Sequence, residues 1–262
     1  MSRPATESPQ AELARLARDN GRGALATVIG PEGQDAIGSK LLVRDDGSTV
    51  GTLGDDELDT AAREAGQELL WAERSEVREL GGVEVFIDVV APPPRLLILG
   101  AVDYAAALCR LARAAGWRPY VCDPRVAFAT SERFPEAEEV VAAWPDEAFA
   151  RLGIDRATYI TILTHDPKLD DAALRIALRS EAAYVGAMGS RRAQARRRER
   201  LLEAGMSPEE LDRLAAPIGL DLGATNPEET ALSIMAEVVA VRNGHDGGRL
   251  GRVAGRIHEV GA

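Results

Sequence analysis

Cysteine is scarce in this 262-residue sequence, which has only Cys109 and Cys122. Two cysteines are too few for a four-cysteine zinc site or an iron–sulfur cluster, and we expect no metal site. They also do not make a disulfide framework, which fits a reducing compartment such as the cytoplasm. Both fall within expected regular elements, so we expect buried, inert thiols.

Long apolar runs and an excess of positive charge are also missing. No stretch approaches 18 uncharged apolar residues, and the N-terminal sequence MSRPATESPQAELARLARDNG lacks the apolar core of a signal peptide. We therefore expect an acidic, soluble, cytoplasmic protein with no membrane segment. The formal net charge is −11, whereas proteins that bind nucleic acid carry clustered Lys and Arg. No nucleic-acid partner is expected.

What the sequence does have is enough apolar content, 45% of 262 residues, for two modest domains. The run Pro92-Pro93-Pro94 can continue neither a helix nor a sheet and marks a stiff boundary. Before it lie two helix-like segments, strand-like segments and a hairpin with Asp46-Gly47 at its turn. Residues 11–90 are therefore predicted to form a small α+β domain.

After the prolines, short apolar runs alternate with helix-like segments. This alternation predicts a parallel sheet covered on both faces, so we expect an α/β domain with a doubly wound sheet over residues 95–243. In its last helix, Thr225 and Glu228 fit a capping box. The predicted apolar face of that helix consists of Leu232, Met235, Val238 and Val239. Residues 244–262 are expected to form a loose tail.

A glycine turn follows the first strand of this domain. In the pattern G-x-G-x-x-G/A, the middle glycine lets backbone approach a pyrophosphate. Gly100 supplies the bend and Ala105 suits helix packing, but Val102 replaces the middle glycine. Asp103 adds a negative charge at the helix start, which opposes an anionic ligand.

Asp123 lies at the end of the second strand, where an acid can bind a ribose hydroxyl. Arg125 is placed to face a 2′-phosphate instead. Two interpretations stay open: a nucleotide site at Gly100, Asp123 and Arg125, or a doubly wound sheet whose first crevice has lost its phosphate site. The predicted fold is the same in both cases.

Thr164-His165-Asp166 follows a later strand, at the edge where open α/β sheets bind ligands. A His-Asp pair there can position or exchange a proton. The alternative is an ordinary loop in which Asp166 fixes the turn before Pro167. Strand-end loops carry binding sites disproportionately, which favours the functional interpretation.

The segment YVGAMGSRRAQARRRERL repeats the strand, glycine and helix pattern. Gly189, the predicted N-cap Ser190, and Arg191 and Arg192 in the first turn would form a phosphate cradle. Residues 196–198 and Arg200 are predicted to form a solvated helix face. Beyond this helix, the segment APIGLDLGATNPEE predicts an ordered loop in which Asp221 bonds to backbone or to ligand.

These segments together resemble the C-terminal domain of the XdhC/CoxI family, the maturation factors of molybdenum hydroxylases. The resemblance spans about residues 95–243 and rests on several motifs in the right order, VCDPR, RFPEAEEV, TILTHDPKLDDAAL, YVGAMGSRR and APIGLDLGATNPEE. It implies a Rossmann-like domain after a smaller N-terminal domain, usually in a homodimer. It also implies binding of molybdenum cofactor, help with its sulfuration, and delivery to an apo-enzyme of the xanthine dehydrogenase or carbon monoxide dehydrogenase type.

The sequence departs from the family pattern at two places. The glycine turn has Gly100-Ala101-Val102-Asp103 where the family commonly has G-A-G-H. In the N-terminal domain, Glu57 stands where the family has a cysteine, and a carboxylate cannot act as a thiolate nucleophile. The acidic cluster around Glu57 could bind a hard cation, but an acidic helix start is the favoured interpretation.

Three functions therefore compete. The first is a maturation chaperone that binds molybdenum cofactor or a related anionic nucleotide ligand and docks on an apo-hydroxylase. The second is an NAD(P)-dependent oxidoreductase using Gly100 and Asp123, against which Val102 argues. The third is a ligand-free paralogue that acts as an interaction protein. The segments at His165 and Ser190 favour the first, which needs no catalytic activity.

Overall fold

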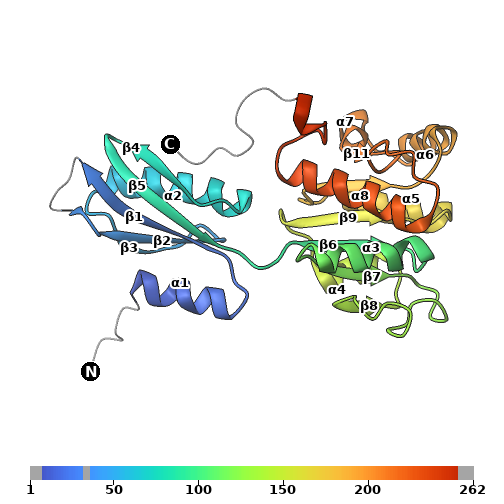
Figure 1. Ribbon diagram of the computed structural model, residues 1–262, viewed down its shortest axis with the longest axis horizontal. Coiled ribbons are helices and arrows are strands. Elements are labelled where there is room, and N and C mark those ends of the chain that lie inside the picture. The colour runs from blue at the N-terminus through green and yellow to red at the C-terminus, as the bar shows by residue number, and fades with distance from the viewer. Residues whose placement is uncertain (1–7, 32–35, 253–262) are drawn as a thin grey trace. The chain divides into compact units, whose positions relative to one another are not determined.

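The computed structural model describes residues 8–31 and 36–252 (Figure 1). The chain divides into two compact units, whose boundary lies between Pro92 and Pro93. The start of the chain, residues 1–7, and the last part of the predicted tail, residues 253–262, lie outside the described residues. The described part of the tail ends in a short 3₁₀ helix, η2 (Leu250–Arg252).

The first unit is an antiparallel sheet with strand order β3-β2-β1-β5-β4 and two helices. Apolar side chains of β1, β2 and β5 form its core with α2. The strand β4 was not predicted, because its side chains are only partly buried and do not alternate between apolar and polar. The elements are α1 (Pro9–Arg18), β1 (Gly23–Pro31), β2 (Lys40–Arg44), β3 (Thr49–Thr52), α2 (Asp56–Ala72), β4 (Glu76–Leu80) and β5 (Val83–Val90).

Local chemistry explains the hairpin and the start of α2. Gly47 has a φ of +80°, and the Asp46 carboxylate accepts a 2.8 Å hydrogen bond from the amide of Ser48, which closes the β2–β3 turn. Asp55 is the N-cap of α2, and Asp59 accepts a 2.7 Å bond from the amide of Leu53. Members of the acidic cluster thus serve the helix start.

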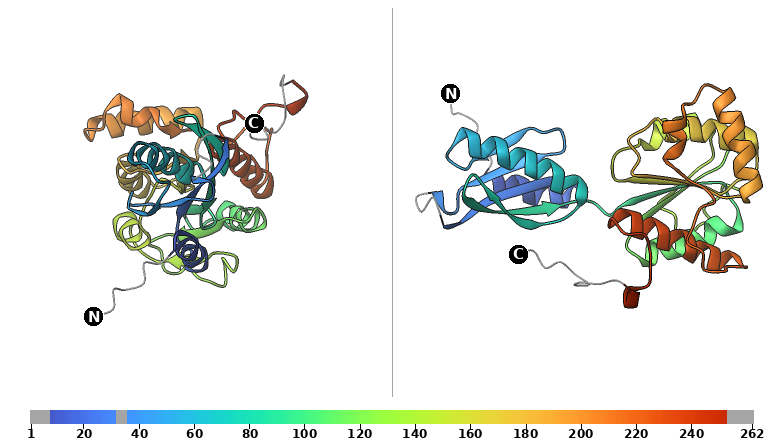
Figure 2. Two further views of the ribbon diagram at one scale, coloured as in Figure 1. Left: turned by 90° about the vertical axis from the view of Figure 1, so that its left-hand side faces the viewer. Right: turned by 90° about the horizontal axis from the view of Figure 1, so that it is seen from above.

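The second unit is a sheet of six strands in the order β11-β10-β9-β6-β7-β8, and every neighbouring pair is parallel. Helices α3 and α8 cover one face, and α4, α5 and α6 cover the other (Figure 2). The chain runs outward from β6 to β8, then returns to β9 beside β6 and runs outward again. This is the predicted doubly wound α/β fold, and the prediction is confirmed.

The elements of this unit are β6 (Arg95–Leu99), α3 (Asp103–Ala114), β7 (Arg118–Cys122), β8 (Glu139–Val141), α4 (Pro145–Leu152), β9 (Thr158–Ile162), α5 (Pro167–Ala177), β10 (Tyr184–Ala187), α6 (Arg191–Glu203), α7 (Pro208–Asp212), β11 (Leu214–Ala215) and α8 (Pro227–Arg242). The two-residue strand β11 was not predicted, because it is too short for its apolar pattern to be seen.

Two details of α8 differ from the sequence prediction. The N-cap is Asn226, whose side chain accepts a 2.8 Å bond from the amide of Glu229, so the predicted capping box was one residue too early. Leu232 and Val239 of the predicted apolar face are exposed. The buried positions are Ala231, Ser233, Ile234, Met235 and Val238. Apolar residues surround most of this helix, so spacing alone does not select the buried side.

Candidate functional site at the carboxyl edge of the parallel sheet

Parallel strands place their carboxyl ends at one edge of a sheet. In the second unit this edge gathers the segments that follow β6, β7, β9, β10 and β11 (Figure 1). All the predicted site residues lie in these segments. The topological switch point lies between β6 and β9, which are neighbours although two strands intervene in sequence.

Gly100 and Thr164 meet at this switch point. Gly100 has a φ of +109°, and a Cβ placed on it would lie 2.7 Å from Cγ2 and 3.1 Å from the amide nitrogen of Thr164. Only glycine combines this backbone angle with so close an approach of the adjacent strand. The predicted bend at Gly100 is therefore also a packing contact between the two halves of the sheet.

The Asp123 carboxylate is buried and engaged within the protein. Only 1% of the residue is exposed. It accepts hydrogen bonds from the amides of Ala101 at 2.8 Å and Arg125 at 2.9 Å, and from the Arg125 guanidinium at 2.8 and 2.6 Å. Burial alone would raise the pKa of Asp123, but the bonds from Arg125 and Ala101 hold it below the ordinary value. Both oxygens thus bind the chain itself rather than lying open to a ribose.

Arg125 connects this pair to the loop after β9. Its side chain is half-exposed. The hydrogen bonds that it donates to Asp123 raise the pKa of Arg125, and the charge of Asp166 adds to the effect. Arg125 follows β7 and Asp166 follows β9, and these two strands flank β6 in the sheet.

The glycine turn itself is partly filled by protein. Val102 is half-buried against the core of the second unit and makes no side-chain cap for α3. Arg133, from the long loop after β7, donates to the carbonyl of Ala101 at 3.2 Å and pairs with Asp103 at 3.5 Å. Arg133 begins the motif RFPEAEEV but was not predicted as a site residue, because its loop follows no periodic pattern.

A buried network joins the ends of β9 and β10. The Thr164 hydroxyl donates to Asp170, which also accepts a 2.6 Å bond from Arg197. Arg197 donates in turn to the carbonyl of Met188 at 3.2 Å. Arg197 is buried, so its predicted place on a solvated helix face was wrong: this one side chain of the arginine run turns inward toward the Asp170 carboxylate.

His165 and Asp166 are exposed at the same edge. Asp166 is the N-cap of α5 and accepts a 2.9 Å bond from the amide of Lys168. This is the turn-fixing role that the sequence offered as the alternative. The exposed His165 imidazole remains the available acid–base group of this loop.

The start of α6 is an open cationic part of the edge. Ser190 is the N-cap and accepts a 3.2 Å bond from the amide of Ala193, and Gly189 has a φ of +138°. Arg191 and Arg192 are exposed, and neither forms an ion pair with any residue in the ranges 8–31 and 36–252. Two such cations at the positive end of a helix dipole favour an anionic guest.

Asp221 lies in an exposed turn of the loop after β11. That loop is fixed to α8, because Glu237 accepts a 2.8 Å bond from the amide of Gly219 and another bond from Tyr184, and the amide of Leu220 donates to the carbonyl of Ser233. The ordered loop that the sequence predicted is therefore present, with its carboxylate at the surface.

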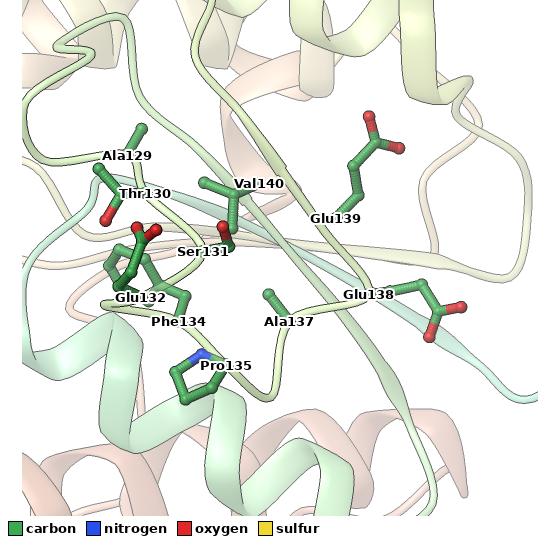
Figure 3. A pocket seen from close by; sticks show the side chains of 10 residues that line it. All are labelled: Ala129, Thr130, Ser131, Glu132, Phe134, Pro135, Ala137, Glu138, Glu139 and Val140. Atoms are coloured by element: carbon green, nitrogen blue, oxygen red, sulfur yellow. The ribbon is translucent and has the colours of Figure 1, made fainter.

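Beside the edge lies a hollow of about 410 Å³ lined by residues of segment 129–140 (Figure 3). Its lining includes Glu132, Glu138 and Glu139 and none of the predicted site residues. The carboxylates disfavour an anion there. The predicted anion-binding groups thus lie on the strand ends and not in this hollow.

Both cysteines are buried in the core of the second unit. Burial raises the pKa of Cys109 and that of Cys122 to about 12 each. No group of three or more His, Cys, Asp or Glu side chains with the arrangement of a metal site occurs in the part of the chain that the structure describes. None of its helices there is long and apolar enough to traverse a bilayer.

Two family models match the chain. One, described as the XdhC Rossmann domain, matches residues 96–238, and the other, described as the XdhC and CoxI family, matches residues 16–81. A solved structure described as a xanthine dehydrogenase from Bacillus halodurans superposes with a TM-score of 0.63 and 23% identity, covering 89% of this chain and 66% of that one. At that identity it shows likeness of fold alone.

Three curated relatives are also similar. A protein named as a probable xanthine dehydrogenase subunit, from Bacillus subtilis (strain 168), is 31% identical over 60% of this chain and 46% of its own length. The "Uncharacterized protein YqeB" of Escherichia coli (strain K12) is 29% identical over 90% of this chain and 47% of its own length. The "Molybdenum cofactor insertion chaperone PaoD" of the same organism is 32% identical over 58% of this chain and 41% of its own length. The chain spans about half the length of the curated relatives it matches.

Proposed function

This chain belongs to the XdhC and CoxI family, as its motifs predicted, and we propose that it is a maturation factor for a molybdenum hydroxylase. In this role it binds molybdenum cofactor, or a related nucleotide ligand, and delivers it to an apo-enzyme of the xanthine dehydrogenase or carbon monoxide dehydrogenase type. We propose that it does so as a cytoplasmic homodimer. The insertion-chaperone name of one relative supports the assignment.

The observation that carries the proposal is the pair of exposed guanidiniums of Arg191 and Arg192 at the start of α6, which have no ion-pair partner among the described residues. In a protein of net charge −11, such a site attracts a small anion more readily than the rest of the surface does. The phosphate of a pterin or nucleotide has the oxygens that guanidinium groups and helix N-termini bind.

The cofactor's phosphate fits the residues present, but transfer of sulfur by the protein's own thiols does not. A sulfur carrier needs an accessible thiolate. Cys109 and Cys122 are buried with raised pKa values, and the exposed Glu57 occupies the position of the family's cysteine. The proposed role is therefore binding and delivery, with sulfuration left to another protein.

The NAD(P)-dependent alternative has less support. It requires the Asp123 carboxylate to bind a ribose hydroxyl, whereas Asp123 is already occupied by Ala101 and Arg125. It also requires room for a pyrophosphate at the glycine turn, where Val102 and Arg133 lie. The ligand-free alternative would leave Arg191 and Arg192 without a role.

Calorimetric titration of the full chain with molybdopterin and with NADP⁺ separates the three functions. If the chain is a maturation factor, we expect it to bind molybdopterin at least tenfold more tightly than NADP⁺. The reverse preference, together with NADPH oxidation, would establish the oxidoreductase. Heat from neither ligand, with a folded protein in the calorimeter, would contradict the proposal and leave an interaction protein.

A further inference from the structure

The loop between β7 and β8, residues 123–138, lies wholly within the described part of the chain and contains no helix or strand. It is much longer than the connections of about 4–6 residues that are usual in compact domains, and loops of this length are commonly functional. It leaves the sheet at the carboxyl edge, next to the glycine turn. Two contacts with Ala101 fix it there: the Asp123 carboxylate accepts from the Ala101 amide, and Arg133 donates to the Ala101 carbonyl.

Between Arg125 and Arg133 lies Phe128, which is 46% exposed. The Cζ atoms of Arg125 and Arg133 lie 5.0 and 5.6 Å from the centre of its ring. Arg133 also donates a 3.3 Å bond to the Phe128 carbonyl, which orients the turn that carries the ring. The three side chains form one exposed aromatic and cationic surface, which we call the Phe128 platform.

The platform lies beside the switch point, because Arg133 donates to the carbonyl of Ala101 in the turn after β6. The strands β7 and β9 flank β6 in the sheet, so the platform after β7 and the His165 loop after β9 border the same end of β6. Planar heterocycles bind between groups of these kinds: aromatic rings and guanidinium planes stack on the ring, and carboxylates accept hydrogen bonds from its amino groups.

We propose that the Phe128 platform binds the planar heterocyclic end of the anionic ligand whose phosphate is held at Ser190, Arg191 and Arg192. The inference rests on the proposed function and adds the orientation of the ligand to it. β7 and β10 are three strand spacings apart, about 14 Å. The ligand therefore lies extended along the edge and crosses the switch point, with its ring toward β7 and its phosphate toward α6.

The test compares three probes on the full chain: GMP, which has a ring and a phosphate, ribose 5-phosphate, which lacks the ring, and inorganic phosphate. Phe128→Ala and Arg133→Met should each weaken GMP binding about tenfold, the usual cost of losing a stacking partner. They should leave the affinity for ribose 5-phosphate and inorganic phosphate unchanged. Arg192→Ala should weaken the binding of all three.

Phe86→Ala is the matched control, because Phe86 is 36% exposed and lies in the first unit. Phe128→Leu keeps apolar bulk and removes only the ring, so it should weaken GMP binding even if Phe128→Ala destabilises the loop. If wild type and Phe128→Leu bind GMP equally well while Arg192→Ala binds it more weakly, the inference about the platform is wrong and the proposed function still stands. A wild-type chain that binds none of the probes and no molybdopterin overturns the proposed function as well.

Discussion

Arg197 donates a 2.6 Å hydrogen bond to Asp170, and both side chains are almost fully buried. Because Asp170 also accepts from Thr164 and Arg197 also donates to Met188, the ion pair fixes the loop after β9 to the loop after β10. A buried ion pair adds little net stability compared with apolar side chains of the same volume. The role of the ion pair here is to hold the His165 loop in a fixed position relative to the start of α6.

Removing one partner of this pair should be costly. Asp170→Asn leaves the Arg197 charge buried without a counterion, which we expect to lower the free energy of unfolding by about 3–5 kcal/mol. The double variant Asp170→Leu with Arg197→Met removes both charges and should recover most of the loss. Urea unfolding of the three proteins measures this. A single Asp170→Asn variant as stable as wild type would contradict the role of the pair.

The same double variant separates positioning from stability. If the pair holds the two loops in register, the double variant should regain stability and still bind inorganic phosphate more weakly than wild type. If the pair is only part of the core, phosphate affinity should recover together with stability. Calorimetric titration of wild type and the double variant with inorganic phosphate, under conditions in which both are fully folded, distinguishes these results.

Glu12 should make the first unit sensitive to acid. Hydrogen bonds from Arg15 and Arg44 lower the pKa of this carboxyl from 4.5 to about 2. Since the folded pKa lies below the unfolded one, the stabilisation is complete above about pH 4.5 and is lost as the pH falls toward 2. The free energy of unfolding should therefore fall over this range, and less steeply in Glu12→Gln.

The fluorescence of Trp71 in α2 reports unfolding of the first unit, once the two tryptophans of the second unit are replaced by phenylalanine. Denaturant titrations at pH 6, 4 and 3 provide the comparison. If wild type and Glu12→Gln lose stability in parallel on acidification, Glu12 is not the group responsible.

Gly100→Ala should destabilise the second unit. The substitution meets both an unfavourable φ and a contact of 2.7 Å with Thr164, for which we expect a cost of about 3 kcal/mol or more. Gly116→Ala is the matched control, since Gly116 also has a positive φ but open space around it. Its cost should stay near about 1 kcal/mol. Equal losses of stability in the two variants would contradict the packing role of Gly100.

The thiols should be unreactive in the folded protein. Because burial raises the pKa of Cys109 and Cys122 to about 12, a thiol reagent at pH 8 should modify neither residue until denaturant is added. Replacing both by alanine should leave ligand affinity unchanged. Rapid labelling of the native chain would instead make a sulfur-transfer role available.

The doubly wound sheet was predictable from the sequence, because alternating apolar runs and helices fit few other folds. The Ser190 cap and the hairpin turn at Asp46-Gly47 follow from short-range chemistry and were also correct. The inward turn of Arg197 was not predictable, since its partner Asp170 lies on another helix. Phe128 and Arg133 were missed for the same reason, because their relation to the glycine turn exists only in three dimensions.

The central claim is that the start of α6 holds the phosphate of an anionic ligand. Its most direct test is the affinity of the full chain for molybdopterin in wild type and in the double variant Arg191→Ala with Arg192→Ala. Arg156→Ala is the control, because Arg156 is exposed just before β9, at the opposite edge of the sheet. We predict a loss of at least about tenfold in the double variant, as expected for charge-assisted hydrogen bonds, and no change in the control. Equal affinities in all three proteins would contradict the account.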